Sequence, residues 1–183
     1  MNKEAFLKMR IYFTVIVTVA IWSILLWDHY HGGVPSHHLL ANKDLPSFSN
    51  WWGGLLLPAL TWFLLYRVQK RIFQNDDSVT KGTTYRELVY GFLGALLFGA
   101  LLSVFFLFGI RDLPGYMLLA LLPLALFLPV YRAECLLGLV IGMTFTFGGV
   151  LPILIGTIFV IVTSIIYLFL RPGILFVIAK LRG

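Results

Sequence analysis

The sequence predicts an all-α integral membrane protein with six transmembrane helices arranged as three hairpins. Of its 183 residues, 60% are hydrophobic and 12% are charged, whereas a soluble domain of this length carries about 25% charged residues. Apolar runs long enough to cross a bilayer recur along the whole chain and leave no space for a separate soluble domain, so residues 1–183 are expected to form one domain. The runs are continuous and do not alternate, which argues against a transmembrane β-barrel.

Two polar stretches separate the first three spans. The first apolar run ends at Trp27 with no small-residue cleavage site after it, which indicates a retained helix and not a signal peptide. Gly32-Gly33 is expected to stop this helix. Pro35 suits the first position of a short surface helix that continues to Ala41. The second span ends before a basic stretch that begins at Arg67. The first three spans are therefore expected at 11–27, 51–66 and 87–110.

Prolines and glycines divide the rest of the chain. Pro123 and Pro129 are expected to bend the fourth span. A polar break at 131–134 precedes the fifth. The apolar stretch after it is too long for one span, and Gly148-Gly149 divides it into two helices. The last three spans are therefore expected at 113–130, 133–148 and 150–170. The tail, 173–183, is expected to lie on the membrane surface as an amphipathic helix.

The basic residues orient the predicted bundle. With six spans and a cytoplasmic N-terminus, all of the 14 lysines and arginines except Lys43 and Arg111 face the cytoplasm. This asymmetry follows the positive-inside rule. It places both termini in the cytoplasm and the first loop on the periplasmic side of an inner membrane. Because the basic residues flank apolar runs, the net charge of +6 indicates orientation in a lipid bilayer and no nucleic-acid partner.

Small residues mark predicted packing faces. Ala95 and Gly99 are four residues apart, as are Gly138 and Gly142. This spacing lets helix backbones approach closely, either within one chain or between copies of a homo-oligomer. The run 53–58, GGLLLP, also echoes 148–152, GGVLP. The echo would suit tandem helical hairpins, although unrelated membrane helices reuse Gly, Pro and Leu as well.

All the histidines of the chain fall in the loop between the first two spans. The spans themselves carry almost no ionisable groups, so charged chemistry is expected at the rim of the bundle. Neutral imidazole ligates zinc, copper, nickel and iron, and a carboxylate completes such a site or orients an imidazole. The candidate metal ligands are His29, His31, His37 and His38, and the accompanying carboxylates are Asp28 and Asp44.

We expect these residues to form a membrane metalloenzyme site. A divalent transition metal, with zinc as first choice, would lower the pKa of a bound water to about 7. Asp28 and Asp44 would act as the catalytic carboxylates, and the substrate would be amphiphilic or lipid-linked. Asp28 and His31 share a face if the first helix continues past Trp27, whereas His29 and His31 share a face only in extended chain. His37 and His38 diverge on a helix.

Two other classes of function stay open. The chain could be a transporter or channel with the histidine-rich loop as its outer mouth, although mid-membrane charges are missing. It could also be a non-catalytic accessory or scaffold subunit, whose loop histidines bind headgroups or titrate with pH. Glu87 and Glu134 are expected to form interfacial ion pairs beside Arg86 and Arg132. The single cysteine, Cys135, is expected to be a packed, inert thiol.

Overall fold

The computed structural model describes residues 2–34, 36–38, 47–74, 78–110 and 112–182, and the side chains of 36–38, 47, 48, 78–81, 83 and 182 lie outside this description. The described residues form long helices and one β-hairpin. In chain order these are α1 (Lys3–Tyr30), β1 (Ser36–His38), β2 (Ser47–Ser49), α2 (Gly53–Gln74), α3 (Ser78–Leu107), α4 (Asp112–Leu124), α5 (Ala133–Phe147), α6 (Val150–Ile165) and α7 (Arg171–Arg182). A 3-10 turn, Asn50–Trp52, leads into α2, and a π-helical turn, Ile166–Leu170, joins α6 to α7.

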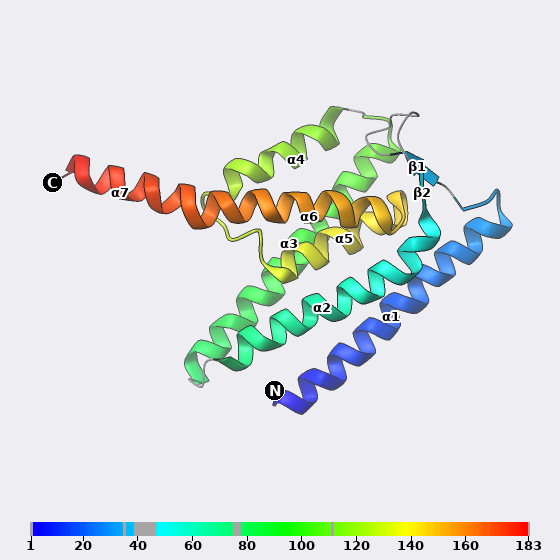
Figure 1. The fold of residues 1–183 in the computed structure, drawn as a ribbon, viewed down its shortest axis with the longest axis horizontal. Helices are drawn as coiled ribbons and strands as arrows, with labels where there is room; N and C mark the ends of the chain where they lie inside the picture. The colour runs from blue at the N-terminus through cyan, green and yellow to red at the C-terminus, as the bar shows by residue number, and fades with distance from the viewer. Residues whose placement is uncertain (1, 35, 39–46, 75–77, 111, 183) are drawn as a thin grey trace.

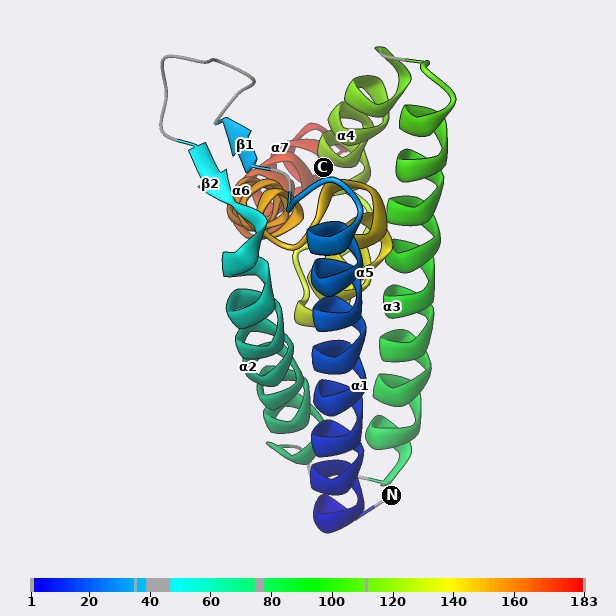
Figure 2. The same ribbon diagram turned by 90° about the vertical axis from the view of Figure 1, so that its right-hand side faces the viewer.

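The helices cross in two directions. α1, α2 and α3 run along a common axis, and the rod formed by α6 and α7 crosses them obliquely (Figure 1). In Figure 2 the first three helices stand upright while α6 points toward the viewer. α5 packs against α2, α3 and α6, whereas α4 contacts mainly α3 and α6. α7 projects beyond the rest of the bundle (Figure 1).

The bundle has two chemically different ends. At the first, which we call the basic end, Phe6 at the start of α1 packs with Val68 and Ile72 near the end of α2, and with Leu88 near the start of α3. At the opposite end, which we call the histidine end, the ring centroids of Trp22 and Trp51 lie 6.1 Å apart. The β-hairpin adjoins the histidine end (Figures 1 and 2).

The described helices agree in number with the predicted spans when α6, the π-helical turn and α7 are taken as one rod. Three stretches, Lys3–Tyr30, Thr84–Leu107 and Val150–Leu181, are long and apolar enough to cross a membrane. The predicted stop after the first helix is confirmed, because α1 ends at Tyr30 and Gly32 and Gly33 both have positive φ.

Most helices differ in length from the predicted spans: α1 (Lys3–Tyr30) and α2 (Gly53–Gln74) are longer than 11–27 and 51–66, and α3 begins at Ser78 and not at residue 87. α4 ends at Leu124 and not at residue 130. Residues 125–128 continue as hydrogen-bonded turns, in which the N–H of Leu128 donates to the carbonyl oxygen of Leu124 at 2.9 Å, and Pro129 beyond them lacks a backbone N–H donor. The tail is helical as predicted: it forms α7, which continues from α6 through the π-helical turn, and its expected place on a membrane surface stays a prediction.

The expected surface helix from Pro35 to Ala41 is wrong where the structure describes it. Ser36–His38 form strand β1, which pairs antiparallel with β2 and places Ser36 opposite Ser49. In so short a helix, few hydrogen bonds offset the unfavourable free energy of forming the first turn. Pairing with β2 instead gives the backbone N–H and C=O groups of β1 hydrogen-bond partners. The described part of the chain is therefore all-α in class, as predicted, with one small two-stranded hairpin in place of the expected surface helix.

Glycines bring α3 and α5 into close contact. A Cβ added to Gly138 would overlap the carbonyl oxygen of Phe92, and one added to Gly142 would lie 2.5 Å from the carbonyl oxygen of Leu96. The hydroxyl of Ser103 donates to the carbonyl oxygen of Gly142 at 3.2 Å. The predicted small-residue faces thus pack against each other within one chain. The homo-oligomer stays a prediction, but these faces are already occupied.

The two segments that echo each other in sequence also meet. A Cβ on Gly53 would lie 2.9 Å from the Cα of Gly149, and one on Gly149 would lie 2.7 Å from the Cα of Gly53. Asn50, whose side chain is 2% exposed, fills the space beside Gly148, where φ is +72°. The contact joins the start of α2 to the start of α6. Because the two backbones approach so closely, only glycine fits at these positions. The internal repeat stays a prediction.

An arginine is buried between α1 and α2 near the basic end. Arg10 is 8% exposed, and its Nη1 donates to Oε1 of Gln69 at 2.9 Å. Its guanidinium carbon lies 3.7 Å from the ring centroid of Trp62 and 5.6 Å from that of Tyr66. Hydrogen bonding and two aromatic faces therefore stabilise this cation in the bundle.

Replacing Gly138 tests the α3–α5 contact. We expect Gly138→Ala to lower the free energy of unfolding by about 1–3 kcal/mol, because the added methyl group meets rigid backbone of α3. Thermal unfolding in detergent micelles measures the effect. Gly94→Ala is the matched control, since a Cβ at Gly94 meets nothing within 4 Å. Equal melting temperatures for the two variants would show that the contact is looser than described.

Candidate functional site

At the histidine end, His29 and His31 lie on different sides of α1. The His31 ring stacks on Trp27 with centroids 3.9 Å apart, and its Nδ1 lies 2.9 Å from the Trp27 carbonyl oxygen. The His29 ring instead meets Trp51 edge-on, with centroids 5.8 Å apart. Residues two apart on a helix are rotated by about 200°. Because α1 continues to Tyr30, these two imidazoles do not converge.

The other predicted ligands are described only in part. His37 and His38 lie in β1. Asp44 and the side chains of His37 and His38 fall outside the described residues. Asp28 is half-buried, and its carbonyl oxygen accepts hydrogen bonds from the backbone N–H groups of His31 and Gly33.

The described residues do not support a metal cluster. Among them, no group of three or more His, Cys, Asp and Glu side chains is placed to hold a metal ion. The sequence brings His29 and His31 together, but the helix separates them. A metal site that uses His37, His38 or Asp44 stays a prediction.

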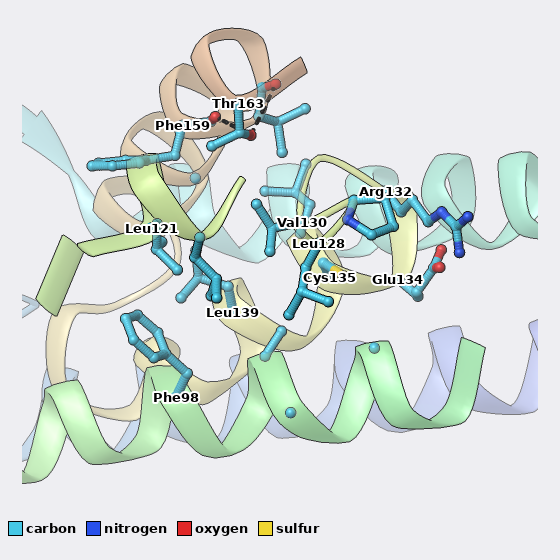
Figure 3. Close-up of a pocket in the computed structure, with 18 of the residues that line it drawn as sticks. Phe98, Leu121, Leu128, Val130, Arg132, Glu134, Cys135, Leu139, Phe159 and Thr163 are labelled. Carbon is cyan, nitrogen blue, oxygen red and sulfur yellow. Dashed lines mark hydrogen bonds between the residues drawn. The ribbon is translucent and has the colours of Figure 1, made fainter. Parts of the chain in front are cut away.

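A cavity of about 670 Å³ lies elsewhere, between α3, α4, α5 and α6 (Figure 3). Its volume falls in the range of about 300–1,000 Å³ typical of small-molecule sites. Apolar side chains make one end, where Phe98, Leu121 and Leu139 are grouped in Figure 3. Charged and polar side chains make the other end. The residues that line the cavity include Glu87, Gly91, Gly94, Phe98, Leu121, Leu128, Pro129, Val130, Arg132, Glu134, Cys135, Leu139 and Tyr167.

The non-helical segment between α4 and α5 forms part of the wall. Leu128, Pro129 and Val130 line the cavity directly before Arg132. Glycines on α3 open the opposite wall, because a Cβ on Gly94 would meet nothing within 4 Å. The cavity therefore has space for two reasons: α4 ends early on one side of it, and α3 carries small residues on the other side.

Two ion pairs join four chain segments at the polar end. Arg132 Nη1 lies 2.6 Å from Glu87 Oε2 of α3, and Arg71 Nη2 of α2 lies 2.8 Å from Glu134 Oε1 of α5. Ion pairing of both glutamates is confirmed, but neither pairs with the arginine beside it in the sequence. Glu87 pairs with Arg132 and not with its neighbour Arg86, because α3 packs along the start of α5.

Arg132 keeps its charge in this arrangement. Burial lowers the pKa of Arg132, but the hydrogen bond to Glu87 and the nearby charge of Glu134 outweigh it, so the pKa is raised overall. A guanidinium is charged at all physiological pH values. The pair with Glu87 therefore persists wherever that carboxylate is ionised.

Glu134 is the least satisfied polar group of the cavity. Its side chain is 2% exposed, and only Oε1 has an ion-pair partner, while Oε2 is buried without a hydrogen-bond partner among the described residues. Gly91 allows this placement, since a Cβ there would lie 3.2 Å from Glu134 Cγ and 3.3 Å from Cys135 Sγ. A buried acceptor without a donor costs free energy. A hydrogen-bond donor on a ligand would therefore stabilise Glu134 more than the other polar groups of the cavity.

Sequence reasoning missed this cavity. Gly91 and Gly94 occur in an apolar helix with no phosphate-binding pattern, and Cys135 resembles a packed core thiol. The available signals were the prolines near the end of α4 and the acidic residue directly before Cys135 at the start of an apolar run. Neither signal says which helices would meet.

The comparisons with known proteins add no functional information. No family model, no curated protein and no solved structure matches this chain. The geometry of the two ends is therefore the evidence on which a function can be argued.

Proposed function

We propose that this chain is a multi-pass membrane protein that holds a single-chain amphiphile in the cavity between α3, α4, α5 and α6. The observation that carries the proposal is the division of one cavity into an apolar end and an ion-paired end. An acyl chain fits the group around Phe98 and Leu139, and a polar head fits beside Arg132 and Glu134. Figure 3 shows these two groups at opposite sides of the cavity.

Surface chemistry supports the membrane location. Large apolar side chains are exposed on several helices, including Ile16 at 65%, Leu97 at 62% and Phe145 at 79%. Soluble proteins rarely expose apolar surface over such wide areas. We place the N-terminus in the cytoplasm, the basic end at the inner leaflet and the histidine end in the periplasm, as the distribution of basic residues predicts.

The short helices are compatible with six crossings. At 1.5 Å per residue, α4 and α5 are only about 20 and 23 Å long, less than the roughly 30 Å of a hydrocarbon core. Non-helical backbone is tolerated at membrane depth where it lines a cavity. Residues 128–130 do line this cavity, so the segment after α4 can complete the fourth crossing.

The metalloenzyme is the second candidate. One observation favours it: β1, which carries His37 and His38, lies at the same end of the bundle as His29 beside Trp51 (Figure 2). Zinc bound there by the histidines, with Asp28 or Asp44 as general base, would hydrolyse a lipid-linked substrate at the outer face. The accessory-subunit alternative predicts that neither end binds a small ligand.

Filling the cavity tests the first candidate. We expect Gly94→Leu to weaken binding of radiolabelled dodecanol in lipid nanodiscs at least tenfold, because the new side chain occupies the cavity without a clash. Gly115→Leu on α4 is the matched control, since a Cβ there also meets nothing within 4 Å and Gly115 does not line the cavity. Wild type and control should bind about one dodecanol per chain. Equal binding by all three proteins, or by empty nanodiscs, would exclude the cavity.

Metal analysis tests the second candidate. If it is right, protein purified without chelator retains close to one equivalent of zinc, copper or iron. The double variant His29→Ala and His37→Ala then loses most of it, because a site without two of its imidazoles binds weakly. Lys70→Ala, at the basic end, serves as the control. A wild-type protein that neither retains nor takes up these metals would remove this candidate.

A further inference from the structure

We infer that the head group recognised in the cavity is a neutral hydrogen-bond donor, such as an alcohol, and that the Oε2 atom of Glu134 accepts its hydrogen bond. This inference rests on the proposed function and specifies its ligand. It starts from an imbalance in hydrogen bonding: the carboxylate is almost fully buried, and Oε1 is paired with Arg71 at 2.8 Å. The second oxygen has no partner among the described residues.

Charge balance selects a neutral head. The charged groups that line or flank the polar end are Glu87, Glu134, Arg132 and Arg71, and they already form two pairs. An anionic head would add a negative charge beside the free oxygen of Glu134. A cationic head would add a positive charge between two guanidinium groups. A hydroxyl supplies the missing donor and leaves the two pairs neutral overall.

The carboxylate is held in place before a ligand arrives. Arg71 fixes Oε1 from the side of α2, and the absence of a side chain at Gly91 lets Cγ of Glu134 lie against α3. Glu134 also lies in the first turn of α5, where a negative charge interacts favourably with the helix dipole. These contacts explain why a carboxylate is stable at this position. They leave Oε2 without a donor, and because this oxygen is closed to water in the described structure, a hydroxyl in the cavity reaches it when the side chain of Glu134 turns toward the ligand.

The same geometry limits the ligand to one acyl chain. The cavity holds about 670 Å³, and Phe98 from α3, Leu121 from α4 and Leu139 from α5 close in on its apolar end (Figure 3). A long-chain alcohol, or a lipid with one chain and a free hydroxyl, matches this shape. Cys135, the only cysteine of the chain, lines the cavity beside Glu134.

The experiment compares four ligands of equal chain length on wild-type protein in nanodiscs: dodecanol, dodecyl methyl ether, laurate and dodecyltrimethylammonium. We expect dodecanol to bind at least tenfold more tightly than the ether, which lacks only the donor, and more tightly than either ion. Because this comparison uses no variant, a folding defect cannot obscure it.

Two variants then assign the acceptor. In Glu134→Gln the preference for dodecanol over the ether should fall to threefold or less, because a neutral amide accepts a weaker hydrogen bond than a carboxylate. Glu4→Gln, which removes an exposed carboxylate at the start of α1 that does not line the cavity, should keep the full preference. A preference unchanged in Glu134→Gln would overturn the assignment, as would a wild type that binds laurate most tightly or does not distinguish alcohol from ether. If none of the four ligands binds wild type above empty nanodiscs, the proposed function itself fails.

Discussion

Close backbone contact between α3 and α5 is the constraint on which the rest of the structure depends. Gly138 and Gly142 let α5 lie directly on the backbone of α3, and this pair has the most extensive contact in the bundle. With that contact in place, the start of α5 falls beside Gly91, and Glu134 reaches Arg71 across the bundle. Larger residues at these positions would move α5 outward and separate the groups that form the polar end of the cavity.

The cavity results from two elements that cannot close over this core. α4 ends at Leu124 and is followed by irregular turns up to Pro129, and Gly94 provides no side chain on the α3 wall. Charged groups gather at only one end of the space because burying ions is costly unless they are paired. Arg132 and Glu87 satisfy each other there. The result is a site with separate apolar and polar parts.

The sequence predicts the local features of this fold and fails at the long-range ones. The stop at Gly32-Gly33 and the break at Gly148-Gly149 each depend on two adjacent glycines, so the local sequence is enough to predict them. The histidines are close in sequence, but helical rotation sends His29 toward Trp51 and His31 toward Trp27. The reverse holds for Glu134 and Arg71, which are far apart in sequence and meet only because α2 packs against α5. No local pattern reveals such a pair, so the cavity could not be predicted.

The two candidate sites cannot belong to one reaction centre, and the length of α2 shows why. Trp51, which contacts His29, directly precedes α2, whereas Arg71, which pairs with Glu134, lies near its end. At 1.5 Å per residue the intervening helix spans about 27 Å, close to the thickness of a hydrocarbon core. A metal-bound hydroxide at the histidine end therefore cannot reach a head group held by Glu134. A ligand in the cavity would enter from the leaflet at the basic end, so hydrolysis at the histidine end would require a different substrate.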